Sequence, residues 1–228
     1  MSPVRLLLSS LLFALLPAVA VSQAQAADGG WIDSVRKGGY VIVIRHGQTT
    51  SDNSDPMANP AKGTDPKAAD PKAADPMSNP AKKGAGERQL SEQGRAQAKS
   101  VGEAMHKLKI PVGVVMTSPL QRAVDTGTLL GYGSATTNPD LGEAGHAVSS
   151  EENTRRAEAL RKIVGQRPAD KNLVIVTHKP NITEAFGKEW SNVTEGEASV
   201  FEPDGKGGYK LVARVPSNDW NGLVKAGG

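Results

Sequence analysis

Cysteine is absent from this 228-residue chain. Its absence excludes disulfide bonds, thiol nucleophiles and thiolate metal sites, so any chemistry must come from histidine, carboxylate, hydroxyl or arginine side chains. Aromatic residues make up only 4% of the sequence, and the net charge of +3 comes without a long basic cluster. A chain with neither a stacking platform for bases nor a strongly basic face is not expected to bind nucleic acid.

Long apolar runs are also lacking, except near the N-terminus. There the basic residue Arg5 precedes an apolar run from Leu6 to about Val21, which Pro17 interrupts. The run is short for a bilayer-spanning helix, which needs ~20 apolar residues. Ala24-Gln25-Ala26 then supplies the small-x-small pattern of a signal peptidase site. We therefore expect residues 1–26 to be a signal peptide, with a periplasmic mature protein that has no stable membrane span; the alternative is an uncleaved anchor.

The rest of the chain, residues 27–228, is long enough for one sizeable α/β domain and short for two. Its composition changes at about residues 51–86, where Asp55–Lys62 recurs almost unchanged as Asp75–Lys82, with two copies of Asp-Pro-Lys-Ala-Ala between them. Dense proline blocks helix and sheet alike, and little apolar surface is present to bury. We expect a mobile insertion that grew by duplication; a lid or a docking segment is the alternative.

Outside this insertion, apolar strands alternate with helices. The strands are expected at 40–44, 112–117, 173–177, 198–201 and 209–215. The helices are expected at 29–37, 92–108, 119–130, 153–164 and from Pro180 onward, with Gly94 as a mild weakness in the second of them. This alternation predicts a three-layer α/β/α sandwich around a mostly parallel central sheet.

Polar groups follow the three strongest strands. Arg45-His46 ends the first, Thr117-Ser118 ends the second and leads to Arg122, and His178 ends the third. Ligands of open α/β sheets bind outside the carboxyl ends of the strands, so these groups are expected to converge. Two guanidiniums can hold a phosphate, and the neutral imidazole that flanking cations favour can attack phosphorus. No carboxylate cluster of the kind that binds metals accompanies them.

The surrounding sequence resembles the histidine phosphatase superfamily, which includes phosphoglycerate mutases and acid phosphatases. Four blocks carry the resemblance: Ile44–Thr49 with its Arg-His-Gly triplet, Leu90–Ala98, Thr117–Thr126 and Val176–Asn181. The triplet alone would be a weak match. Four blocks in the family's order, each at the expected strand end, make the match specific and imply a phosphoglycerate mutase-like fold.

The resemblance implies a phosphohistidine enzyme that needs no metal or other cofactor. His46 would carry the phosphoryl group, while Arg45, Arg122 and His178 would form the phosphate pocket. The family's proton donor is a glutamate between the second arginine and the second histidine, and Glu143 is the best positional match. Glu151 and Glu184 are alternatives, and some compact members have no obvious acid.

Several positions depart from the family pattern or have no assigned role. Gln48 stands where many relatives have glutamate, and a phosphate-binding asparagine would fall near Asp52-Asn53, where the insertion begins. Lys179 is expected to face solvent, although it could reach an anionic substrate. His106 and His146 are expected at the surface, the latter with a possible place beside the pocket.

Three functions are compatible with these residues. The first is a metal-independent phosphomonoester hydrolase acting on a phosphorylated small molecule or an envelope substrate. The second is a phosphoglycerate mutase-type phosphotransferase, which export disfavours because its substrate is a cytoplasmic metabolite. The third is a non-catalytic phosphate-binding envelope module built on the repeat. The sequence does not specify an oligomeric state.

Overall fold

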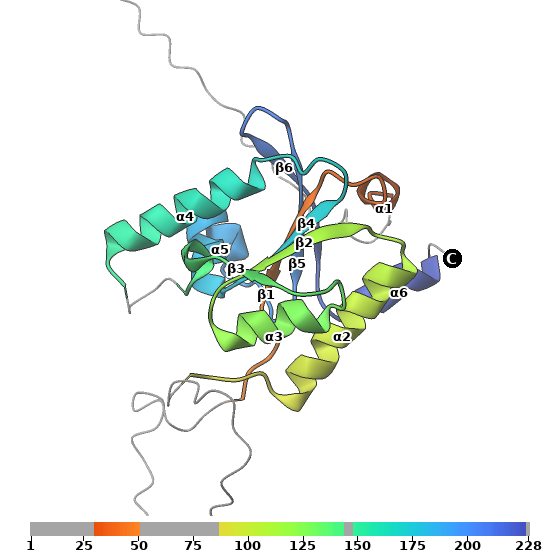
Figure 1. Cartoon of the computed structure of the whole chain (residues 1–228), viewed down its shortest axis with the longest axis horizontal. Helices are drawn as coiled ribbons and strands as arrows, with labels where there is room; N and C mark the ends of the chain where they lie inside the picture. Colours follow the sequence, from red (N-terminus) through yellow and green to blue (C-terminus); the bar gives the residue numbers. More distant parts are fainter. Residues whose placement is uncertain (1–29, 51–86, 144–147, 227–228) are drawn as a thin grey trace, which may run out of the picture.

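The computed structural model describes residues 30–50, 87–143 and 148–226 (Figure 1). The predicted signal peptide at 1–26, the repeat insertion at 51–86 and His146 lie outside these residues. Within the described part of the chain, no helix combines the length and the apolar character needed to cross a membrane.

A six-stranded sheet in the order β3-β2-β4-β1-β5-β6 forms the centre of the molecule. Its strands are β1 (Val41–Arg45), β2 (Val112–Thr117), β3 (Thr136–Thr137), β4 (Asn172–Thr177), β5 (Ala198–Pro203) and β6 (Tyr209–Val215). The neighbouring strands β3, β2, β4 and β1 run parallel to one another, whereas β5 is antiparallel to β1 and to β6. The predicted mostly parallel sheet is therefore confirmed.

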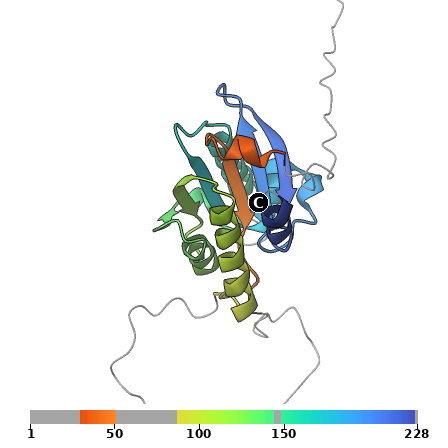
Figure 2. The ribbon, with the colours of Figure 1, turned by 90° about the vertical axis from the view of Figure 1, so that its right-hand side faces the viewer.

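Helices cover both faces of the sheet (Figures 1 and 2). They are α1 (Ile32–Val35), α2 (Glu92–Lys107), α3 (Gln121–Leu129), α4 (Ser150–Val164), α5 (Lys179–Phe186) and α6 (Trp220–Ala226), with the short 3₁₀ helices η2 (Pro139–Leu141) and η3 (Lys188–Trp190).

The alternation of side chains along β1 divides the core in two. Ile42 and Ile44 pack with α1, α2, α3 and α6, while Val41 and Val43 pack with α4 and α5 on the opposite face. Successive side chains of a strand point to opposite faces, so an unbroken apolar strand needs cover on both sides. This confirms the three-layer α/β/α sandwich.

Strand β3 was not expected, and α1 covers only four residues of the helix expected at 29–37. Two further differences have a clear physical cause. Helix α4 begins at Ser150 rather than at 153, because the Ser149 side chain accepts a hydrogen bond from the Glu152 N–H and caps the helix. Helix α6 was not predicted. It is short and contains a glycine, and it is held by tertiary packing, with Trp220 fully buried and in edge-to-face contact with Trp31 at 6.2 Å.

Candidate active site

His46 lies directly after β1, at the carboxyl end of the sheet. Its backbone N–H donates to the Thr177 carbonyl of β4, and its side chain is only 3% exposed. The ring Nδ1 lies 2.8 Å from the Gly47 carbonyl oxygen. A carbonyl only accepts hydrogen bonds, so Nδ1 carries the proton and Nε2 keeps a free lone pair.

Burial keeps the His46 ring neutral. It lowers the pKa of His46 from its usual 6.5 to about 4, and the positive charges of Arg122 and Arg45 add to the effect. The expectation that flanking cations favour the neutral imidazole is right in direction, but removal of the ring from water is the larger cause.

His178 follows β4 and stands next to His46. The two ring centroids are 5.1 Å apart, and His178 is completely buried. Its Nε2 lies 2.8 Å from the Ser118 hydroxyl oxygen, which links the carboxyl ends of β4 and β2. Burial, followed by repulsion from His46 when that ring is protonated and from Arg122, lowers the pKa of His178 to about 2. Both rings are therefore neutral at physiological pH.

Two arginines complete the cationic part of the site. Arg122, in the first turn of α3, is 3% exposed and forms an ion pair with Glu143. Arg45 is held by the Val193 carbonyl at 2.8 Å and by Glu195 at 3.3 Å. Burial lowers the pKa of both guanidiniums, although arginine stays charged in proteins.

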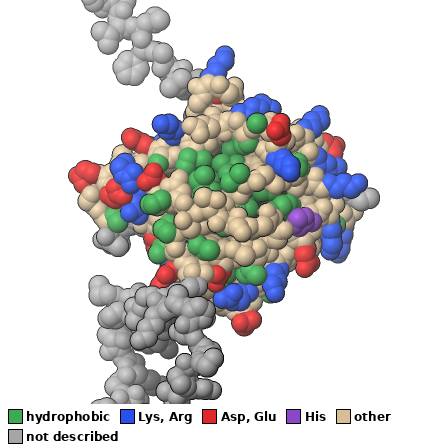
Figure 3. All heavy atoms as spheres, viewed as in Figure 1, with side chains coloured by type: hydrophobic (Ala, Val, Ile, Leu, Met, Phe, Trp, Pro, Cys, Tyr) green, Lys and Arg blue, Asp and Glu red, His purple; other side chains and the backbone are tan. Residues whose placement is uncertain are grey.

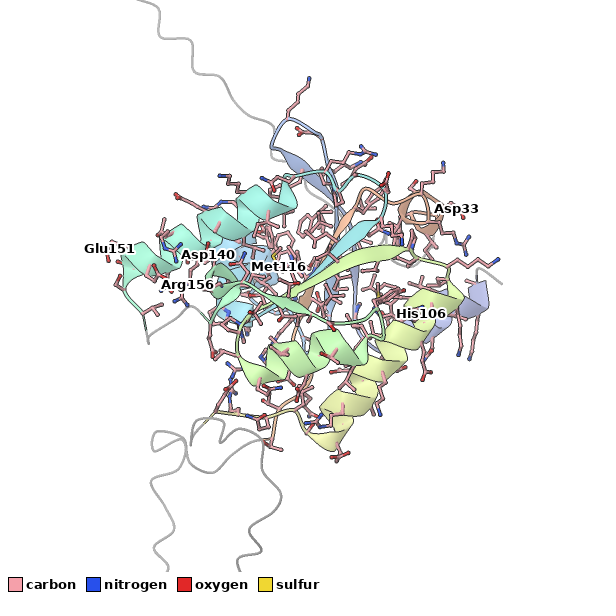
Figure 4. All side chains as sticks on the ribbon, in the orientation of Figure 1. Asp33, His106, Met116, Asp140, Glu151 and Arg156 are labelled. Carbon is pink, nitrogen blue, oxygen red and sulfur yellow. The ribbon has the colours of Figure 1, made fainter. Side chains whose placement is uncertain are left out.

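The structure places Glu143 against Arg122, which is predicted to bind phosphate, and the two alternative acids elsewhere. Besides its ion pair with Arg122, Glu143 has its backbone fixed by Arg156, whose Nη1 donates to the Glu143 carbonyl at 2.9 Å. Glu151 and Glu184 are exposed on α4 and α5, and Figure 4 shows Glu151 at the outer end of α4. Only Glu143 of the three candidates is thus in contact with a predicted site residue among the described contacts.

The remaining candidates lie at the surface. Lys179 is exposed at the start of α5. His106 is exposed on α2 and stacks on Tyr132 with ring centroids 4.0 Å apart. The histidine visible in Figure 3 lies where Figure 4 labels His106.

Sequence reasoning missed Glu87 and Arg88. The Glu87 carboxylate accepts a hydrogen bond from the Gln121 N–H at the start of α3 and lies 3.7 Å from Arg122. Arg88 lies 3.9 Å from Glu143. Both residues lie shortly before the Leu90–Ala98 block, but no periodic pattern marks them, because long-range contacts rather than local structure place them here.

Several buried polar atoms of the site have no hydrogen-bond partner within the described part of the chain. They include His178 Nδ1, Arg45 Nε, Arg122 Nε and Thr117 Oγ1. Buried polar groups are normally paired, so unpaired polar atoms gathered at the strand ends suit a polar ligand that would satisfy them. Within the described ranges, no group of three or more His, Asp or Glu residues has the arrangement of a metal site.

A close approach of two backbones forms the wall of the site. Helix α2 crosses the loop after His46 so tightly that a Cβ on Gly94 would overlap the Gln48 carbonyl oxygen, and one on Gly47 would lie 2.8 Å from the Gly94 carbonyl oxygen. The low helix propensity of glycine predicts only a weakness of the helix at Gly94, but the residue has a further role. Its missing side chain allows α2 to pack against the His46 loop.

We expect Gly94→Ala to destabilise the protein by on the order of 2–3 kcal/mol, because the methyl group forces α2 away from Gln48. Thermal unfolding measures the change. Gly222→Ala is the matched control, since nothing lies within 4 Å of a Cβ there and alanine is a better helix former. A Gly94→Ala protein as stable as the Gly222→Ala protein would contradict the close approach.

Comparison with known proteins agrees with this arrangement. A family model described as histidine phosphatase superfamily (branch 1) matches residues 41–148. A search of curated proteins finds no match.

Solved structures show the fold at low identity. The protein histidine phosphatase SixA complexed with tungstate is 16% identical, with a TM-score of 0.52 over 79% of this chain and 98% of that one. Phosphoserine phosphatase from Entamoeba histolytica with 3-phosphoglyceric acid is 14% identical (TM-score 0.51, 78% and 96% covered). A mycobacterial glucosyl-3-phosphoglycerate phosphatase with VO3 is 17% identical (TM-score 0.51, 78% and 100% covered). Residues 41–148 thus match the histidine phosphatase superfamily (branch 1), and the chain shares the fold of these solved phosphatases.

Proposed function

We propose that this protein is a metal-independent phosphomonoester hydrolase that works through a phosphohistidine on His46. The observation that carries the proposal is a buried, neutral His46 whose Nε2 lone pair is free, beside two arginines and a second neutral histidine. Such a nucleophile needs no deprotonation step. The fixed guanidiniums provide positive charge where the phosphoryl oxygens become more negative in the transition state.

The reaction would proceed in two displacements. In the first, phosphate displaces Glu143 from Arg122, and the freed carboxylate takes up a proton from solvent. The Nε2 lone pair of His46 then forms a bond to phosphorus, the bond from phosphorus to the ester oxygen breaks, and Glu143 gives that proton to the departing oxygen. In the second, the Glu143 carboxylate takes a proton from water as the water oxygen attacks phosphorus. The N–P bond then breaks, which returns the electron pair to Nε2 and releases inorganic phosphate.

The substrate class follows from the proposed export. If residues 1–26 direct the chain to the periplasm, its substrate would be a phosphorylated small molecule or a phosphate group of the cell envelope. A mutase would instead return the phosphoryl group to a second hydroxyl of its substrate, and a binding module would turn nothing over.

A phosphate-release screen separates these functions. The panel should include a phosphorylated envelope sugar and the substrate classes named for the similar structures: a phosphohistidine protein, phosphoserine and glucosyl-3-phosphoglycerate. The hydrolase requires sustained phosphate release and an acid-labile, alkali-stable phosphoenzyme that disappears in His46→Ala. Isomerisation without net release would support the mutase, and no turnover on any substrate would support the binding module.

The protonation state of the two site histidines gives a direct test of the nucleophile. We expect the NMR signals of His46 to be those of a neutral ring down to about pH 5, and those of His178 to stay neutral still lower, because burial lowers both pKa values. A lowered pKa means that protons bind only as the pH falls toward 4, so the neutral form predominates above it. Titration of either ring near pH 6.5 would contradict a site that keeps both histidines neutral and His46 ready to attack.

A further inference from the structure

Glu143 lies between two guanidiniums in different surroundings. Its Oε2 is bonded to Arg122, whose side chain is 4% exposed, and its Oε1 lies 3.9 Å from Arg88, whose side chain is 50% exposed. The first partner belongs to the buried phosphate pocket and the second to its rim. One carboxylate is thus shared between the pocket and the rim.

The contact with Arg122 competes with substrate. A phosphate in the pocket needs the Nη donors of Arg122, and in this structure Glu143 and Glu87 face them. Two anions cannot share the same donors without strong repulsion, so an incoming phosphate must displace the Glu143 carboxylate. The Glu143 backbone can stay in place during this exchange, because Arg156 holds its carbonyl oxygen.

Arg88 is positioned to receive the displaced carboxylate. Its contact with Glu143 is the only ion pair of Arg88 among the described residues. A short antiparallel ladder fixes its backbone to the nucleophile loop: the Thr50 N–H donates to Gln89, and the Ser91 N–H donates to Gln48. The charge of Arg88 also reaches the centre of the site, since it contributes to the lowered pKa of both His46 and His178.

We propose that Arg88 is a positioning residue for Glu143: it holds the Glu143 carboxyl group at the rim of the pocket after phosphate has taken Arg122. The inference rests on the proposed function, in which Glu143 protonates the leaving group. In the empty enzyme, the Glu143 carboxylate is therefore paired with Arg122. When substrate is bound, Arg88 keeps the Glu143 carboxyl group within reach of the ester oxygen.

The kinetic test compares two leaving groups. An alkyl phosphomonoester needs a proton on its departing oxygen, whereas nitrophenolate leaves readily without one. In Arg88→Ala, the ratio of kcat for the alkyl ester to kcat for nitrophenyl phosphate should fall about tenfold, a part of the 10²–10⁴-fold that a positioned acid contributes. Arg88→Lys should restore most of the ratio. Arg36→Ala removes a partly buried arginine that pairs with Asp33 and donates to the Leu108 carbonyl, so it should leave the ratio unchanged in protein that thermal unfolding shows to be folded.

The binding test needs no turnover. Calorimetry with orthovanadate should show tighter binding to Glu143→Gln than to the wild type, because the competing carboxylate is gone. Arg88→Ala should weaken orthovanadate binding several-fold when Glu143 is present and have little effect in the Glu143→Gln background. Such non-additivity is expected of residues that act through one another.

Two results would overturn the role of Arg88. An equal loss of orthovanadate affinity in both backgrounds would make Arg88 a direct phosphate contact. An unchanged leaving-group ratio in Arg88→Ala would mean that Arg88 does not position the acid. Failure of the proposed function looks different, because the wild type would then form no phosphohistidine and release no phosphate.

Discussion

His46→Ala should reduce phosphate release to background, a loss of at least about 10⁴-fold, because no other side chain can take over the covalent step. His178 has its Nε2 within 2.8 Å of Ser118 and holds its ring at a fixed angle to His46, so it is not free to replace the nucleophile. Steady-state phosphate release, with thermal unfolding to confirm that the variant is folded, measures the effect.

His106→Ala is the matched control for this substitution. His106 is an exposed histidine on α2 that stacks on Tyr132 away from the strand ends, so its loss should leave turnover unchanged. A double variant, His46→Ala with Arg122→Ala, should be no slower than His46→Ala alone, because residues that act in one step are not additive. Residual turnover by the folded His46→Ala protein would mean that another group attacks phosphorus.

Arg122→Ala should lower kcat/KM by about 10³-fold, because in the proposed mechanism this most buried arginine of the site would stabilise the charge that develops on the phosphoryl oxygens. The substitution also removes the shared partner of Glu87 and Glu143. Kinetics on one phosphomonoester, with KM and kcat determined separately, measures the loss.

Arg122→Lys distinguishes charge from geometry. Lysine keeps the positive charge but lacks the planar pair of donors that matches phosphate, so we expect it to recover only part of the activity. Full activity in Arg122→Lys would show that a point charge is sufficient. Near-normal activity in Arg122→Ala would place phosphate binding elsewhere.

The sequence predicts the parts of this protein that local patterns govern. The apolar run of β1, the Ser91 cap of α2 and the polar residues after each strand are all visible in one dimension. Topology then brings His46 and His178 together, because β1 and β4 are adjacent and parallel with Arg45 opposite Thr177.

The contacts that position the side chains of the site cannot be predicted from local sequence patterns. The Gly94 close approach, the cap that Glu87 gives to α3 and the Arg88–Glu143 pair all join residues from different elements. Helix propensity even suggests the wrong role for Gly94. These features follow from tertiary packing, which one sequence without its fold does not reveal.

The pairing of Thr49 with Leu90 has an evolutionary consequence. Because the backbone ladder fixes the two ends of the intervening stretch side by side, the geometry at His46 does not depend on how many residues lie between them. Insertions and deletions of repeat units can therefore accumulate there without moving the nucleophile. A one-residue insertion within β1, by contrast, would exchange the two faces of the strand and misdirect His46. The fold thus places a stretch that tolerates changes in length beside a strand that does not.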